Sequence, residues 1–191
     1  EKFIDDMVLA ELQKLQLSPS PLATDAELLR RTYITTIGML PTADAVRDYV
    51  TDNSSDKRAR LVESLLARPE FVDYWTYKWS DILLASSWQL RPEAVKPYYQ
   101  WIRQQVEENV PWDEFARRVV TARGNTLEGG ATNFYSVHQD AETITENVCQ
   151  AFLGLSIGCA KCHNHPLEKW TNDQYYAMAN MFARVRSKGW G

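Results

Sequence analysis

The chain has 191 residues, of which 45% are hydrophobic and 12% aromatic, so it can bury a sizeable core without disulfide or metal support. Its formal net charge of -4 argues against nucleic-acid binding, and no basic run is longer than a few residues. No apolar stretch approaches the roughly 18 residues of a membrane helix, and Glu1 opens into an amphipathic segment rather than a secretory signal.

The first third of the chain predicts a succession of helices, because apolar residues recur at helical spacing between Pro and Gly residues. Pro19 and Pro21 end the first helix. Thr24 and Glu27 form a capping box that starts the second, and Thr42 starts a short third helix. The residues expected to face inward are Phe3, Met7 or Val8, Leu12, Leu15, Leu28, Tyr33, Ile37, Leu61, Leu65 and Leu66.

The middle of the chain predicts three more helices and then a loop. Pro92 and Pro111 suit the first turns of two of these helices. From residue 123 to 133 the pattern lapses, and Gly124, Gly129 and Gly130 predict a loop that is the weakest part of the chain. The expected inward residues are Phe71, Trp75, Trp79, Ile82, Tyr98, Trp101, Ile102, Val106, Phe115 and Val119.

Two further helices are expected after this loop. Asp140 can cap the first of them, and Thr171 and Gln174 form a capping box for the last. We therefore predict an all-α fold in which residues 1–191 form one domain of roughly eight to nine helices. The expected inward residues are Ile144, Val148, Ala151, Phe152, Leu155, Tyr175, Met178, Ala179, Phe182 and Val185.

A C-x-x-C-H motif lies between the last two predicted helices, at Cys159, Cys162 and His163. This spacing is typical of covalent haem attachment. Two thiols a short step apart can add to the two vinyl groups of one haem, and the next histidine can bind the iron as proximal ligand. The motif predicts one haem c per chain.

Other uses of the motif remain open. A C-x-x-C pair can be a redox dithiol, but no βαβ pattern accompanies it here. Zinc could use Cys159, Cys162, His163 and His165, although four ligands within seven residues make an awkward cage. A plain disulfide between the two cysteines would leave His163 unexplained.

The motif and its flanks resemble the planctomycete-type cytochrome c domain, a family first catalogued as a domain of unknown function. The resemblance implies a secreted bacterial protein with this helical domain near its front and further domains behind, and it implies no defined biochemical role. The family has small residues at the position of Cys149, so no role for this thiol follows. The matching runs are AFLGLSIGCAKCHNHP at 151–166, EKW at 168–170, DQYY at 173–176, LRR at 29–31, GMLPT at 38–42, DKR at 56–58, RPEF at 68–71 and KWSD at 78–81.

His165 and Met178 are the further cofactor-site candidates. His165 lies too close to His163 to reach the other haem face, so we expect a propionate contact, a second-sphere hydrogen bond or a loop-capping role. Met178 lies on the apolar face of the last helix and is the best candidate for the distal iron ligand, although such a residue is more often core packing. Other distal candidates are Met181, Cys149, His138 (more often a solvated loop residue) and no protein ligand at all.

The sequence favours extracytoplasmic electron transfer by a monohaem domain, with a redox protein or an adjacent domain of the same polypeptide as partner. Haem attachment implies a periplasmic or extracellular location. One alternative is a haem enzyme or gas-responsive domain, which needs an open distal site with a polar Arg or His. Another alternative is a structural binding module whose fold is stabilised by a bound zinc ion. Catalytic activity is therefore left open.

Overall fold

The computed structural model describes residues 2–186, which contain ten α-helices, short 3₁₀ and π turns and no strand. The all-α prediction is confirmed, with one or two more helices than expected. None of the helices in the described range is long and apolar enough to cross a membrane. The chain divides into two compact units, residues 1–66 and 67–191. The single domain over 1–191 stays a prediction, and the units are described in turn.

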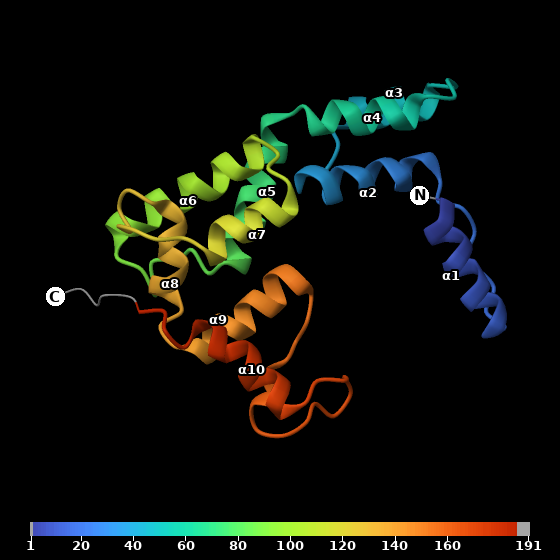
Figure 1. Cartoon of the computed structure of the whole chain (residues 1–191). Helices are drawn as coiled ribbons and strands as arrows, with labels where there is room; N and C mark the ends of the chain where they lie inside the picture. Colours follow the sequence, from blue (N-terminus) through green and yellow to red (C-terminus); the bar gives the residue numbers. More distant parts are fainter. Residues whose placement is uncertain (1, 187–191) are drawn as a thin grey trace. The chain divides into compact units, whose positions relative to one another are not determined.

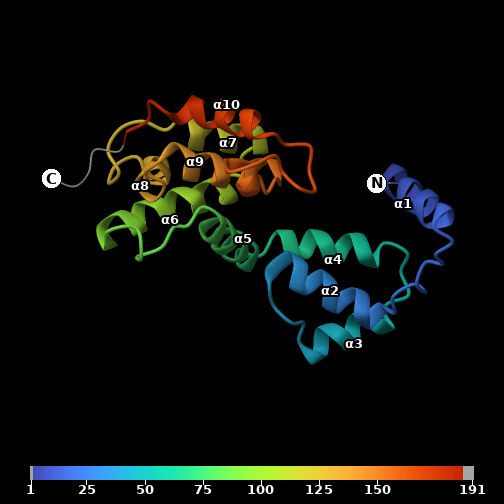
Figure 2. The ribbon, with the colours of Figure 1, turned by 90° about the horizontal axis from the view of Figure 1, so that it is seen from below.

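The first unit contains four helices, three of which pack together (Figure 2). Thr24 and Glu27 form the predicted capping box, and Gly38 ends that helix in the left-handed conformation that glycine adopts without strain. The Thr42 side chain caps the next helix. An ion pair of 2.7 Å joins Lys57 to Asp25. The helices are α1 (Lys2–Lys14), α2 (Asp25–Ile37), α3 (Ala43–Thr51) and α4 (Lys57–Leu66).

Helix α1 forms as predicted but buries none of its residues. Phe3 is 67% exposed and Met7 is 66% exposed, so the expected inward face of this helix has no cover within the described residues. The prediction that these side chains face a core was wrong. Helical spacing indicates which residues share a face, but it does not say whether another element packs against that face.

The second unit holds the main core and the motif (Figure 1). Helices α5 and α6 pack against each other, and α9 packs against α10. Tyr98, Ile102, Phe134 and Val119 are fully buried in the core. The helices are α5 (Pro69–Ile82), α6 (Pro92–Glu107), α7 (Trp112–Val120), α8 (Asn133–Val137), α9 (Ala141–Val148) and α10 (Asn172–Phe182).

Helix α5 presents a different face to the core from the one predicted. Thr76 and Ser80 are its buried residues, whereas Trp75 and Trp79 are half-buried and Ile82 is exposed. Trp79 instead packs in an aromatic group with Trp112, at a ring-centroid distance of 4.4 Å. Phe71, Trp75 and Trp79 therefore line a surface groove. The residues of α5 that are buried are two small hydroxyl residues.

The predicted loop is confirmed for residues 123–129, which are irregular and mostly exposed, but its last part, from Gly130 on, is buried and helical, which the sequence did not predict. Residues 130–136 are all buried, first as a 3₁₀ turn, η1 (Gly130–Thr132), and then as α8. A Cβ atom at Gly130 would lie 2.5 Å from the carbonyl oxygen of Pro97 and even closer to Trp101 Cβ. Glycine is therefore required here because η1 lies directly against α6.

We expect Gly130→Ala to destabilise the protein by about 1–3 kcal/mol, because the added methyl group has no space against α6. Urea denaturation of Gly158→Ala is the matched control. A Cβ at Gly158 meets only the Glu146 carboxylate, at 3.8 Å, which is an ordinary contact. The control should change the free energy of unfolding by less than about 0.5 kcal/mol. Equal effects of the two variants would contradict the close packing of η1 on α6.

Candidate functional site

The motif lies between α9 and α10, as the sequence predicts (Figure 1). After α9 the chain continues as a π turn, η2 (Cys149–Leu153), which Gly154 ends in the left-handed conformation. A 3₁₀ turn, η3 (Gly158–Lys161), then carries the first cysteine. The motif is thus presented on one short turn that is followed by a loop to α10.

Both motif cysteines are free and exposed. Ala160, between them, is fully buried and packs with Ile157 and Tyr175. Free cysteine is among the most buried residue types, so two exposed thiols three positions apart are unusual. The buried alanine anchors the turn from inside while Cys159 and Cys162 remain accessible to a reactant.

The ring of His163 is exposed and is oriented by its neighbour. Its Nδ1 lies 2.7 Å from the carbonyl oxygen of Asn164. A carbonyl only accepts, so Nδ1 carries the proton and donates it, which leaves the Nε2 lone pair available. This is the hydrogen-bonded arrangement typical of a metal-binding imidazole.

His165 serves as an acceptor within its own loop. Its Nδ1 accepts from the backbone N–H groups of Leu167 at 3.2 Å and Glu168 at 2.9 Å. Its backbone N–H donates to the carbonyl of Trp170 at 2.8 Å. Of the roles expected for His165, loop capping is the one that these contacts describe. A contact with a haem propionate through Nε2 stays a prediction.

Asn172, the first residue of α10, ties the motif turn to that helix. Its side-chain N–H groups donate to the carbonyls of Ala160 and Lys161, both at 2.9 Å. In return, the side-chain oxygen of Asn164 accepts from the backbone N–H of Asn172 at 3.0 Å. The Thr171 and Gln174 capping box completes the helix start. These bonds satisfy free groups at a helix end and fix the turn at the same time.

A small apolar cavity of about 70 Å³ lies beside the turn. Within it, the thiol of Cys149 donates to the thioether sulfur of Met178 at 3.3 Å. Burial raises the pKa of Cys149, so the thiol stays protonated. The cavity is lined by Cys149, Leu153, Leu155, Ile157, Trp170, Gln174, Tyr175 and Met178.

Tyr175 joins α10 to α9 under this cavity. It is fully buried, and its hydroxyl donates to Glu146 Oε1 at 2.7 Å. Burial, assisted by this hydrogen bond, raises the pKa of the Tyr175 hydroxyl far above its usual range. Beside the cavity, the two helices are therefore joined by a hydrogen bond from an uncharged hydroxyl to a carboxylate.

Two further candidates for the distal ligand, Met181 and His138, are not among the residues that line the cavity. Met181 is exposed on α10. His138 is 5% exposed, so the expectation of a solvated loop histidine was wrong. Its ring packs 4.8 Å from the Phe134 ring, and burial lowers its pKa to about 4, while the nearby Asp140 opposes this shift. His138 is therefore neutral at pH 7.

The described residues, 2–186, contain no group of three or more His, Cys, Asp or Glu side chains placed to hold a metal ion. The zinc cage considered from the sequence is therefore not assembled here, since His165 Nδ1 accepts from the backbone instead. Cys159 and Cys162 are also free rather than joined as a disulfide. The arrangement is that of two exposed free thiols followed directly in sequence by an exposed imidazole.

One comparison with known proteins gives a match. The family model described as PSCyt2, protein of unknown function (DUF1549), matches residues 3–187. No curated protein and no solved structure matches the chain.

We expect Asn172→Ala to destabilise the protein by about 1–2 kcal/mol, because two side-chain hydrogen bonds to the motif turn are lost. Asn180→Ala, in the same helix and exposed, is the control and should be neutral or slightly stabilising. Amide hydrogen exchange should show faster exchange at Ala160 and Cys162 in Asn172→Ala only. Unchanged exchange there would show that the turn does not depend on Asn172.

Proposed function

Because the chain belongs to the PSCyt2 family, whose function is unknown, we propose its function from the site itself: a monohaem c-type cytochrome domain for electron transfer. Cys159 and Cys162 would hold the haem, and His163 would bind the iron from the proximal side. Such a protein acquires its haem outside the cytoplasm, so we also propose a periplasmic or extracellular location. A redox protein or an adjacent domain would be the partner.

The observation that carries this proposal is the exposure of two free thiols directly before an exposed, oriented imidazole. Each thiol can add across one vinyl group, forming a carbon–sulfur bond while its hydrogen passes to the other vinyl carbon. The reaction needs no oxidant. The haem, when bound, supplies one reversible one-electron centre.

The protein residues around the motif suit this cofactor. Asn164 accepts the Nδ1–H of His163, which holds the imidazole in the tautomer that binds iron through Nε2. The cavity of about 70 Å³ is too small to enclose a porphyrin, so apolar cover must also come from exposed side chains. Leu167, which is 90% exposed two residues after His165, offers such cover.

The nature of the cavity favours electron transfer over haem catalysis. Among the described residues that line it, none is Arg or His, the polar groups expected in a peroxidase-like distal site. Met178 instead contributes a thioether, a ligand typical of electron-transfer haem. We therefore propose Met178 as the distal ligand, with Trp170 and Leu155 excluding water from its surroundings.

Expression of residues 1–191 with a haem-attachment system tests the cofactor. We expect pigment that survives denaturation and acid extraction, a polypeptide mass raised by one haem, and a pyridine haemochrome typical of two thioether links. Cys159→Ala and Cys162→Ala should each leave a single link. Cys149→Ala is the control and should keep both links, because this thiol is buried. Free extraction of the pigment, or an unmodified mass, would overturn the proposal.

The distal ligand is tested on the haem-loaded protein with Met178→Leu. We expect loss of the sulfur-to-iron absorption band and rapid CO binding by the reduced form, because the iron loses its second axial ligand. Met181→Leu, a change of the same type at an exposed position of the same helix, should leave both readouts unchanged. Identical spectra for the two variants would show that Met178 only packs in the core.

A further inference from the structure

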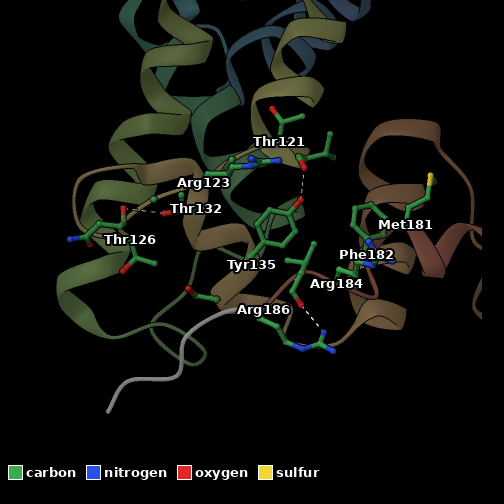
Figure 3. Close-up of a pocket in the computed structure, with 15 residues that line it drawn as sticks. Thr121, Arg123, Thr126, Thr132, Tyr135, Met181, Phe182, Arg184 and Arg186 are labelled. Atoms are coloured by element: carbon green, nitrogen blue, oxygen red, sulfur yellow. Dashed lines mark hydrogen bonds between the residues drawn. The ribbon is translucent and has the colours of Figure 1, made fainter.

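A second pocket lies at the opposite end of α10 from the motif. It has a volume of about 770 Å³, within the range of roughly 300–1,000 Å³ that small-molecule sites occupy. The segment after α7 forms one side, and residues between 181 and 186, at and just after the end of α10, form another (Figure 3). Tyr135 and Ser136 of α8 lie between them. This pocket shares no lining residue with the cavity beside the motif, so its chemistry is independent of the proposed haem site.

The pocket has a concentrated positive charge. Arg123, Arg184 and Arg186 line it, and no Asp or Glu is among its described lining residues. None of the three arginines forms an ion pair with a carboxylate of the described chain. By contrast, Arg103 and Arg118 of the same unit are paired. In a chain whose net charge is -4, this grouping favours an anionic ligand.

The hydrogen-bond donors point to the same class of ligand. The hydroxyls of Thr121 and Thr132 already donate to backbone carbonyls, at 2.7 and 2.5 Å, and the Tyr135 hydroxyl donates to the Val120 carbonyl. These three groups therefore have no proton left for a ligand. The guanidinium groups of Arg123 and Arg184 make no hydrogen bond or ion pair within the described chain, and these charged donors suit a ligand rich in acceptor oxygens.

Arg186 is held in place by the chain itself. Its Nη1 donates to the carbonyls of Ala183 and Val185, both at 2.8 Å, which leaves Nη2 and Nε available. Figure 3 draws one of these bonds as a dashed line from Arg186. On another part of the lining, Phe182 and Met181 contribute apolar surface. A ligand that fills this pocket therefore has a charged end and an apolar part.

We propose that this pocket binds a small organic phosphate. The phosphoryl oxygens accept from Arg123 and Arg184, because the guanidinium fork matches phosphate geometry with two parallel hydrogen bonds. Three positive charges favour the dianion of a phosphate monoester over a singly charged carboxylate or sulfate ester. The apolar part of the ligand lies on Phe182 and Met181.

Isothermal titration calorimetry of the chain with phenyl phosphate tests the proposal. We expect saturable one-to-one binding, weakened about tenfold or more by Arg123→Gln and by Arg184→Gln, because each removes charged hydrogen bonds. Arg117→Gln, an exposed arginine of α7 outside the pocket, is the matched control and should bind as the native chain does. Arg123→Lys keeps the charge but loses the fork, and should bind with intermediate affinity.

Thermal denaturation monitored by circular dichroism establishes that each variant is folded, as expected because the substituted side chains are all exposed. Phenyl sulfate and benzoate, which carry one charge, should bind at least several-fold more weakly than phenyl phosphate. Absence of binding at millimolar phenyl phosphate would overturn the proposal. So would equal weakening by Arg117→Gln, or equal affinity for benzoate, since either result would indicate non-specific charge attraction.

Discussion

The candidate site depends on how the first turn of α10 is satisfied. A helix N-terminus has free backbone N–H groups, and here Thr171, Gln174 and Asn164 supply the acceptors. Asn172, in the same turn, donates in the opposite direction to the carbonyls at 160 and 161. The motif has only one 3₁₀ turn of regular structure of its own. The hydrogen bonds at the start of α10 thus fix the conformation of the short motif turn.

The contact between α9 and α10 supports this arrangement from below. Tyr175 donates to Glu146 across the two helices, and Cys149 meets Met178 sulfur to sulfur. The Tyr175 hydroxyl and the Cys149 thiol are uncharged donors, and Glu146, the carboxylate that accepts from Tyr175, is only partly buried. Helix α10 borders one surface at its start, the motif turn, and its last two residues, Met181 and Phe182, line another, the pocket that contains the three arginines. A substitution that displaces α10 would therefore alter both surfaces.

The sequence predicted correctly those features that depend on interactions between residues close together in the chain. Capping by Thr24, Thr42, Asp140 and Thr171 was predicted and is present, because each cap involves residues three positions apart. Helix α8 was missed because it has five residues and follows a glycine pair. Its burial comes from contact with α6, some thirty residues earlier in the chain, which no local pattern records.

The sequence by itself determined the all-α class, most helix boundaries and the placement of Cys159, Cys162 and His163 on one connecting segment, since periodicity and spacing depend on neighbours within a few positions. Only the tertiary structure decided that α1 lacks a covered face, that His138 is buried, and that two thiols lie exposed while a third is enclosed. It also brought arginines from positions 123, 184 and 186 to one pocket. Burial and pocket composition depend on residues far apart in the chain, and these meet only when the helices pack.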